Sequence, residues 1–273
     1  MLSTLDFSII VVFLVGISAY GLYNSRFNKT SEDYFLAGRD MPWWAAMLSI
    51  VATETSVLTF ISIPGLAYRD DWFFLQLALG YILGRILVSI FLLPAYFKGN
   101  ISSIYEVLGE RFGTRIQKTA SGVFLLTRIL ADGIRFLATA VIVQVVTGWS
   151  LPVAVLIIGV VTVIYTLMGG IRTVVWVDSF QFVLYLGGGL VAVFYILGHS
   201  DVSFGSMLSQ LNAEGKLDIV RWGWNFFSDP WLLFSAVFGG MLLSFASHGA
   251  DYMMVQRVLS VRDLSGARKA MIG

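Results

Sequence analysis

Long apolar stretches dominate the chain, and short polar stretches separate them. Seven of the apolar stretches are long enough to cross a bilayer, because a helix needs about 20 residues to span the hydrocarbon core. They cover residues 5–23, 43–66, 72–97, 119–147, 151–168, 174–197 and 231–256. Since unpaired backbone groups are not tolerated in lipid, each stretch is expected to be helical. The pattern predicts an all-α polytopic membrane protein with about seven transmembrane helices.

Composition points to the same class of protein. Of the 273 residues, 57% are hydrophobic and 13% charged, which leaves too few polar side chains to cover a soluble domain. The formal net charge of +1 argues against nucleic acid as a partner, and the lipid bilayer is the expected one. The chain has no cysteine, which excludes disulfides and thiolate metal sites, and its two histidines leave little for a metal centre.

Lysine and arginine are unevenly divided between the two sides of the predicted membrane. One set of alternate linkers carries twelve of them: Arg26, Lys29, Arg39, Lys98, Arg111, Arg115, Lys118, Arg172, Arg257, Arg262, Arg268 and Lys269. The N-terminus and the remaining linkers carry three: Arg69, Lys216 and Arg221. Because cytoplasmic loops are rich in Lys and Arg, we expect a plasma-membrane protein with its N-terminus outside and the C-terminal end of this chain in the cytoplasm.

The second apolar stretch, 43–66, carries polar residues at its middle. Its centre reads Ala52-Thr53-Glu54-Thr55-Ser56. A carboxylate at mid-membrane depth costs roughly 2.5 to 3.5 kcal/mol, so it marks a candidate functional site. Thr and Ser compete for backbone hydrogen bonds, so we expect the helix to break there and to free carbonyls of the kind that bind Na⁺ in transporters. In the alternative, Glu54 merely pairs with an arginine in an intact helix.

Other predicted spans also carry charge. Within 119–147, Arg128, Asp132 and Arg135 share one helix face at spacings of four and three, so they can pair. With Arg85 and Glu54 added, the spans hold three arginines against two acids. The unpaired arginine would bind either an acidic residue of a missing partner helix or an anionic substrate. The alternative is a self-neutralising structural cluster.

Small and polar residues predict three more features. A stripe of Gln76, Gly80 and Gly84, four residues apart, would let another helix approach closely. The glycine pair at 169–170 predicts a tight turn before the sixth span. The run 244–251 is a second candidate break, and His248 within it is either a proton relay or a packed histidine.

Four segments resemble the sodium:solute symporter family of sugar, proline, sialic acid and vitamin cotransporters. They are SEDYFLAGRDMPWW at 31–44, the membrane segment 49–65, GGIRTVVWVDSFQ at 169–181 and DYMMVQR at 251–257. The resemblance implies a leucine-transporter-type fold of two inverted five-helix repeats, with one extra helix before them. Residues 1–273 are then a single transmembrane domain, divided into the extra helix at 5–23, the first repeat at 43–198 and an incomplete start of the second repeat at 231–273. We therefore expect the chain to be part of a longer carrier.

The resemblance also implies a sodium site. In the family, one Na⁺ binds backbone carbonyls of the first core helix, and the matching positions here are Ala52 and Thr55. Its other ligands lie on an eighth core helix, which this sequence does not reach. By the same resemblance, Glu54 would tune the sodium site, and Asp178 matches an acid at the inner gate.

Substrate positions of the family match residues on three of the predicted helices. They are Ser56, Thr59, Gln76, Ser244 and Ser247. Sialic acid transporters of the family use an arginine of the third core helix for the substrate carboxylate, and either Arg128 or Arg135 would serve here. Ser244 and Ser247 stand where sugar-transporting relatives keep Asn and Tyr, which argues against a close hexose-transporter analogue.

The expected function is sodium-coupled symport of a small polar organic solute, with the arginines favouring a carboxylate-bearing one. Na⁺ is the expected coupling ion, and we expect no organic cofactor, no catalytic residue and no enzymatic activity. Two alternatives remain open. One is a solute-sensing module of a signalling protein, and the other is a proton-coupled carrier that uses Glu54, His248 or Asp251.

Overall fold

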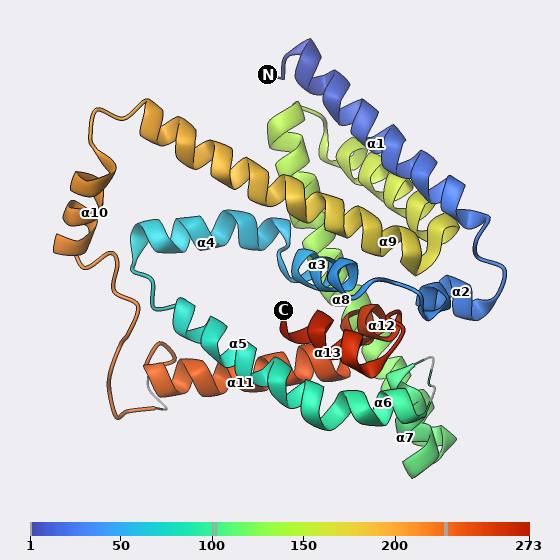
Figure 1. Ribbon diagram of the computed structural model, residues 1–273. Helices are drawn as coiled ribbons and strands as arrows, with labels where there is room; N and C mark the ends of the chain where they lie inside the picture. The colour runs from blue at the N-terminus through green and yellow to red at the C-terminus, as the bar shows by residue number, and fades with distance from the viewer. Residues whose placement is uncertain (1, 100, 102, 227–228) are drawn as a thin grey trace.

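The computed structural model describes residues 2–99, 101, 103–226 and 229–273 (Figure 1). The long helices are α1 (Thr4–Ser25), α3 (Trp43–Glu54), α4 (Val57–Arg69), α5 (Leu75–Leu87), α8 (Thr114–Thr147), α9 (Leu151–Gly198) and α11 (Leu233–Ala250). Shorter elements connect them: α2 (Ser31–Leu36), η1 (Ala37–Arg39), the π-helical turn η2 (Val88–Leu92), α6 (Leu93–Lys98), α7 (Ile104–Phe112), α10 (Phe204–Ala213), α12 (Tyr252–Leu259) and α13 (Leu264–Ile272). The predicted all-α architecture is confirmed for the described residues.

All seven predicted spans correspond to helical segments. By length and composition, five helices are able to cross a membrane, and the bent pair of α3 and α4 makes a sixth candidate. One of the five, α9, has 48 residues, which at 1.5 Å per residue is about 72 Å, or more than twice the hydrocarbon thickness. It is divided at Gly170, where φ is 61° and ψ is −167°. In Figure 1 the ribbon of α9 reverses its direction between two long helical segments, so α9 supplies the fifth and sixth predicted spans.

Gly170 has to be a glycine for two reasons. Its positive φ is disfavoured for residues with a Cβ, and a Cβ at this position would lie 2.8 Å from the carbonyl oxygen of Tyr34. The side chain of Asn28 closes the same corner by donating to the Met168 carbonyl at 3.1 Å. The predicted turn is therefore built around contacts with the segment that follows α1.

The break predicted in the second span is also present. α3 ends at Glu54 and α4 begins at Val57, and the two axes are bent by 64°. Between them, Thr55 has a ψ of 75° and Ser56 is extended. Ser56 caps α4 by accepting a hydrogen bond from the Thr59 amide. The alternative of an intact helix is therefore wrong. Figure 1 shows that α3 and α4 run in different directions.

The second candidate break lies at the last residue of the predicted run. α11 remains helical through Ser244 and His248 and ends at Ala250. Asp251 is extended, with φ −80° and ψ 118°, and its carboxylate accepts the Met253 amide at 2.8 Å to begin α12. The polar run therefore belongs to a regular helix with a sharp exit.

Helices α5 and α11 lie side by side with their backbones in direct contact (Figure 1). A Cβ at Gly80 would lie 2.2 Å from the Val237 carbonyl oxygen, and one at Gly84 would lie 2.5 Å from that of Met241. Gly240 faces them from α11. The close approach predicted from the glycine stripe is confirmed, and it makes α5 and α11 one platform.

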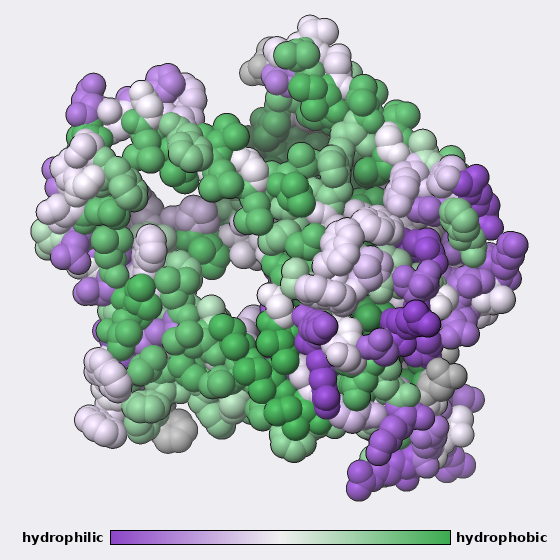
Figure 2. Space-filling view, in the orientation of Figure 1, coloured by the Kyte–Doolittle hydropathy of each residue, from purple (hydrophilic) through white to green (hydrophobic). Residues whose placement is uncertain are grey.

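Apolar side chains cover most of the face seen in Figure 2, and hydrophilic side chains gather over α2, α7 and the region of α12 and α13. These helices belong to the linkers with many lysines and arginines. The division agrees with a protein that lies across a bilayer. The predicted sidedness, with the N-terminus outside, stays a prediction.

We predict that Gly80→Ala destabilises the protein although alanine is the better helix former. The added methyl group overlaps the Val237 carbonyl, and overpacking of this kind costs about 1–3 kcal/mol. Thermal unfolding in detergent would show it as a lower midpoint. Gly16→Ala on α1 is the matched control, because a Cβ there meets no atom within 4 Å. Equal midpoints for the two variants would contradict the close packing.

Candidate functional site

A cavity of about 310 Å³ lies beside the break between α3 and α4. Six residues of the predicted site line it: Glu54, Ser56, Thr59, Arg128, Arg135 and Ser247. They come from three separate parts of the chain, the broken helix, α8 and α11. The remaining lining residues are Thr53, Leu58, Tyr81, Asp251, Met253 and Met254. The structure thus gathers most of the predicted solute-binding side chains around one space.

The break changes the hydrogen bonds of the backbone that borders this cavity. The Thr55 amide still donates to the Val51 carbonyl at 2.9 Å, which completes the last turn of α3. The Ser56 amide donates to the Glu54 carbonyl at 3.1 Å, whereas in a continuing helix it would donate to Ala52. The Ala52 carbonyl thereby loses its helical donor. An oxygen of this kind is available to a hard cation such as Na⁺.

Thr55 faces a second cavity on the other side of the break. This space of about 510 Å³ lies between α1, α4 and the second half of α9, and its polar lining includes Ser56 and Gln181. Ser56 therefore borders both cavities, whereas Thr55 borders only the larger one. Ala52 lines neither cavity with its side chain, so its predicted role rests on its carbonyl alone.

Glu54 binds partners on two other helices. One carboxylate oxygen pairs with the Arg85 guanidinium on α5. The other lies 2.8 Å from Nε2 of His248 on α11, a close polar contact without the alignment of a hydrogen bond. The expectation that Glu54 pairs with an arginine is thus correct, but in a broken helix. The sequence did not reveal the histidine as its second partner.

The arginines at the cavity are more fully paired than the sequence suggested. Arg128 lies 2.7 Å from Asp132 and 3.1 Å from Asp251, while Arg135 lies 3.5 Å from Asp132. The predicted excess of one arginine is therefore wrong, because the count left out Asp251 at the end of α11. The predicted pairing on one face of the helix is confirmed. Arg135 keeps the looser contact, and half of its side chain is exposed.

Asp178 lies in a different cluster, behind α3. It accepts hydrogen bonds from Ser49 at 2.7 Å and from Arg257 at 2.9 Å, with Thr53 at 3.4 Å. Arg257 also donates to Ser49 at 2.9 Å. The cluster ties α3, the second half of α9 and α12 together. Sequence reasoning missed Arg257, because it counted this buried side chain among the solvent-facing residues of a linker.

Gln76 and Ser244 lie outside the cavity and connect helices instead. The Gln76 side chain donates to the Trp231 carbonyl at 2.9 Å and accepts from the Arg221 amide at 3.2 Å. Ser244 donates to the Tyr81 carbonyl at 3.0 Å. Both side chains are fully buried. Their predicted contact with solute stays a prediction, and in this structure both hold α5 against the α11 region.

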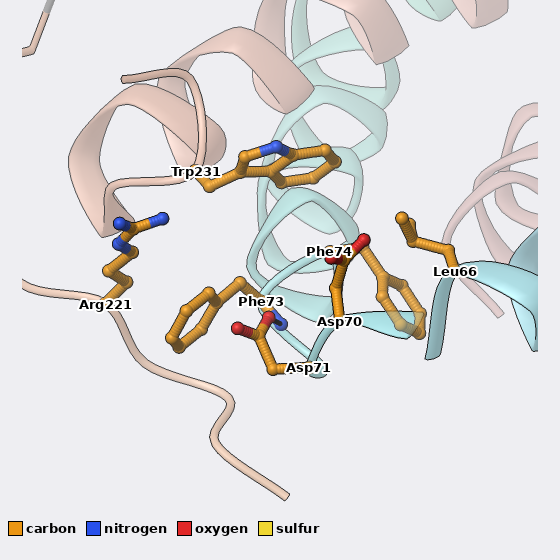
Figure 3. A pocket seen from close by; sticks show the side chains of 7 residues that line it. All are labelled: Leu66, Asp70, Asp71, Phe73, Phe74, Arg221 and Trp231. Atoms are coloured by element: carbon orange, nitrogen blue, oxygen red, sulfur yellow. Dashed lines mark hydrogen bonds between the residues drawn. The ribbon is translucent and has the colours of Figure 1, made fainter. Parts of the chain in front are cut away.

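A smaller cavity of about 190 Å³ lies where α4 turns into α5 (Figure 3). It is lined by Leu66, Asp70, Asp71, Phe73, Phe74, Arg221 and Trp231. Arg221 lies 5.5 Å from the ring centre of Phe73 and pairs with Asp229 at 3.3 Å. In Figure 3 it approaches from the loop side, opposite Asp70 and Leu66. None of the predicted site residues lines this cavity.

The sequence model of the sodium:solute symporter family matches residues 34–273. The chain belongs to this family. Two curated members that resemble it are a sodium/sialic acid symporter of Aliivibrio fischeri, 32% identical over 98% of this chain, and one of Proteus mirabilis, 30% identical over 98%. A human sodium-coupled monocarboxylate transporter is 28% identical over 94%. These proteins are transporters rather than enzymes.

A solved symporter structure shows the same fold. It is described as the substrate-bound outward-open state of a Na⁺-coupled sialic acid symporter, and it matches 99% of this chain at 29% identity with a TM-score of 0.89. The predicted leucine-transporter-type fold is confirmed by this match. The chain covers 57% of that structure and 53%, 54% and 41% of the three curated symporters. It therefore spans about half the length of the symporters it matches.

We predict that Asp178 and Arg257 depend on each other. Asp178→Asn leaves the Arg257 charge buried without its partner, and breaking such a pair costs about 3–5 kcal/mol. Arg257→Met is expected to cost a similar amount, and the double variant less than the sum, because no uncompensated charge remains. Thermal unfolding of all four proteins gives the coupling energy.

The ion pair of Glu32 and Arg39, in which the carboxylate is exposed, supplies the control for this cycle. Glu32 is more than half exposed, so Glu32→Gln is expected to cost less than about 1 kcal/mol. If the losses of stability from Asp178→Asn and Arg257→Met simply add in the double variant, the two residues do not depend on each other.

Proposed function

We propose that this chain forms part of a sodium-coupled symporter that imports a small, polar, carboxylate-bearing solute by alternating access. The observation that carries the proposal is the break between α3 and α4, which borders a cavity lined with hydroxyl groups and arginines. The relatives described above support Na⁺ as the coupling ion, since two are sodium/sialic acid symporters and the third is a sodium-coupled monocarboxylate transporter.

Na⁺ binds at the break, on the carbonyls of Ala52 and Thr55. Na⁺ is a hard cation that prefers oxygen ligands, and the Ala52 carbonyl has lost its helical donor to the geometry at Ser56. Binding of the ion orders the end of α3 and the start of α4. No organic cofactor is part of this mechanism, because transport makes and breaks no covalent bond.

The solute binds in the adjacent cavity. Arg135 receives its carboxylate, since this guanidinium is half exposed and, among the described residues, has one long ion-pair contact, whereas Arg128 is held by two carboxylates. The hydroxyl groups of Ser56, Thr59 and Ser247 line the same space and bind polar groups of the solute. The ordering of the break by Na⁺ fixes Ser56 and Thr59. Each ligand therefore raises the affinity for the other by the same factor.

The cluster around Asp178 acts as the inner gate in this proposal. Its ion pair with Arg257 joins α12 to α3 and α9, so it must open if these elements separate on the inward side. Glu54 sets the electrostatic field at the break from its position between Arg85 and His248.

The proposal predicts sodium-driven uptake that depends on Arg135. The full-length protein in proteoliposomes is expected to accumulate radiolabelled carboxylates under an inward sodium gradient and not under a matched potassium gradient. Arg135→Gln is expected to raise KM for the solute about 10–100-fold, the usual value of a charge-assisted hydrogen bond. Its sodium dependence should persist.

Arg115→Gln is the matched control, because Arg115 is exposed at the start of the same helix. It should leave KM unchanged. Uptake that ignores sodium would refute symport, and tight solute binding without any uptake would indicate a sensor. If uptake is limited to neutral solutes and Arg135→Gln leaves KM unchanged, the proposal that the solute bears a carboxylate is refuted.

A further inference from the structure

His248 is a buried polar side chain between the two halves of the proposed transport site. Its exposed fraction is 0%, although it lies on α11 one residue from Ser247, which lines the cavity. A side chain with two ring nitrogens is costly to bury unless both nitrogens have polar neighbours. In this protein both have them, and the neighbours belong to different parts of the site.

One ring nitrogen faces the sodium side. Nε2 lies 2.8 Å from Oε1 of Glu54, the last residue of α3. The carbonyl of the same Glu54 accepts the Ser56 amide at 3.1 Å and lies 3.4 Å from the Thr59 hydroxyl. Glu54 is therefore part of the break through its backbone and a partner of His248 through its side chain. A movement of the Glu54 backbone at the break is therefore expected to shift the carboxylate that His248 contacts.

The other ring nitrogen faces the solute side. Nδ1 lies 3.0 Å from the Ser247 hydroxyl and 3.1 Å from the Ser244 carbonyl. Ser247 lines the same cavity as Thr59 and Arg135. The imidazole ring is rigid, so its two nitrogens move together. It thus forms a short polar connection from the end of α3 to the cavity wall on α11.

The surroundings of His248 favour this role over simple packing. Arg85 on α5 fixes the second oxygen of Glu54, so the carboxylate has little freedom to turn away. Ser244 is held in turn by its bond to the Tyr81 carbonyl. A displacement at the break is therefore transmitted to the ring rather than absorbed by a mobile neighbour.

We propose that His248 is a positioning residue that couples sodium binding at the break to the solute-binding wall of α11. The inference rests on the proposed function and adds to it the connection through which the two ligands affect each other. His248 touches neither ligand. It acts by fixing the positions of the Glu54 and Ser247 side chains relative to each other, so that ordering of the break by Na⁺ also fixes Ser247.

The test measures solute affinity of the full-length protein in saturating sodium and in potassium, using the solute identified by uptake. The ratio of the two affinities is the coupling factor, which is expected at about 5–150 for the unmodified protein. His248→Leu should lower that factor at least about fivefold while leaving affinity in potassium within about twofold. His248→Gln, which keeps one donor and one acceptor, should restore part of the factor.

His199→Leu is the matched control, because His199 is the other of the two histidines and is exposed after α9. It should leave the coupling factor unchanged. If His248→Leu gives no folded, monodisperse peak in size-exclusion chromatography, the coupling factor is measured instead for Glu54→Gln, for His248→Gln and for the double variant. In that cycle the double variant should lose no more coupling than Glu54→Gln alone.

The outcomes separate this inference from the proposed function. A coupling factor near one in the unmodified protein refutes sodium symport, and the role of His248 falls with it. A factor above five that His248→Leu preserves refutes the role of His248 alone. Additive losses in the cycle refute it as well.

Discussion

The interruption of backbone hydrogen bonding between α3 and α4 is the constraint on which the rest of the structure depends. A carbonyl that loses its donor inside a membrane has no water to replace it, so the surrounding protein has to supply a partner or a site for an ion. Ser56 redirects its amide to Glu54 and caps α4, which leaves the Ala52 carbonyl without its helical donor. The cavity and the charged side chains are arranged around this point.

The surrounding helices hold the break without closing it. Helices α5 and α11 touch along glycines, which makes a platform rigid enough to position Arg85 and His248 against Glu54. Behind α3, Asp178 and Arg257 fasten the same helix to α9 and α12. Glu54, Asp178 and Arg257 each have a partner on another helix. The partners compensate for the loss of hydration, and they also bring distant segments together.

Much of this arrangement is readable from the sequence, and the failures have a common cause. The break was predictable because Thr, Glu and Ser interrupt an apolar stretch at mid-membrane depth. A close helix approach at Gly80 and Gly84 was predictable because these glycines are one helical turn apart, but the sequence did not show that α11 is the helix that approaches. The pairing of Arg128 with Asp251 and that of Asp178 with Arg257 were not predictable, since the two members of each pair lie more than 75 residues apart. Gln76 and Ser244 satisfy backbone carbonyls, and no periodicity in a sequence shows which carbonyl needs a donor. The π-helical turn η2 gave no signal either, because it occurs within a continuous apolar stretch.

The most direct test of the account is hydrogen–deuterium exchange of the full-length protein in sodium and in potassium at equal ionic strength. The account predicts slower exchange of the amides at 55–57 in sodium, since the ion orders the backbone whose carbonyls it binds. The peptides of α5 and α11 away from the cavity should exchange equally in both salts. Identical exchange at 55–57 in sodium and potassium would contradict the claim that the broken helix is the sodium site.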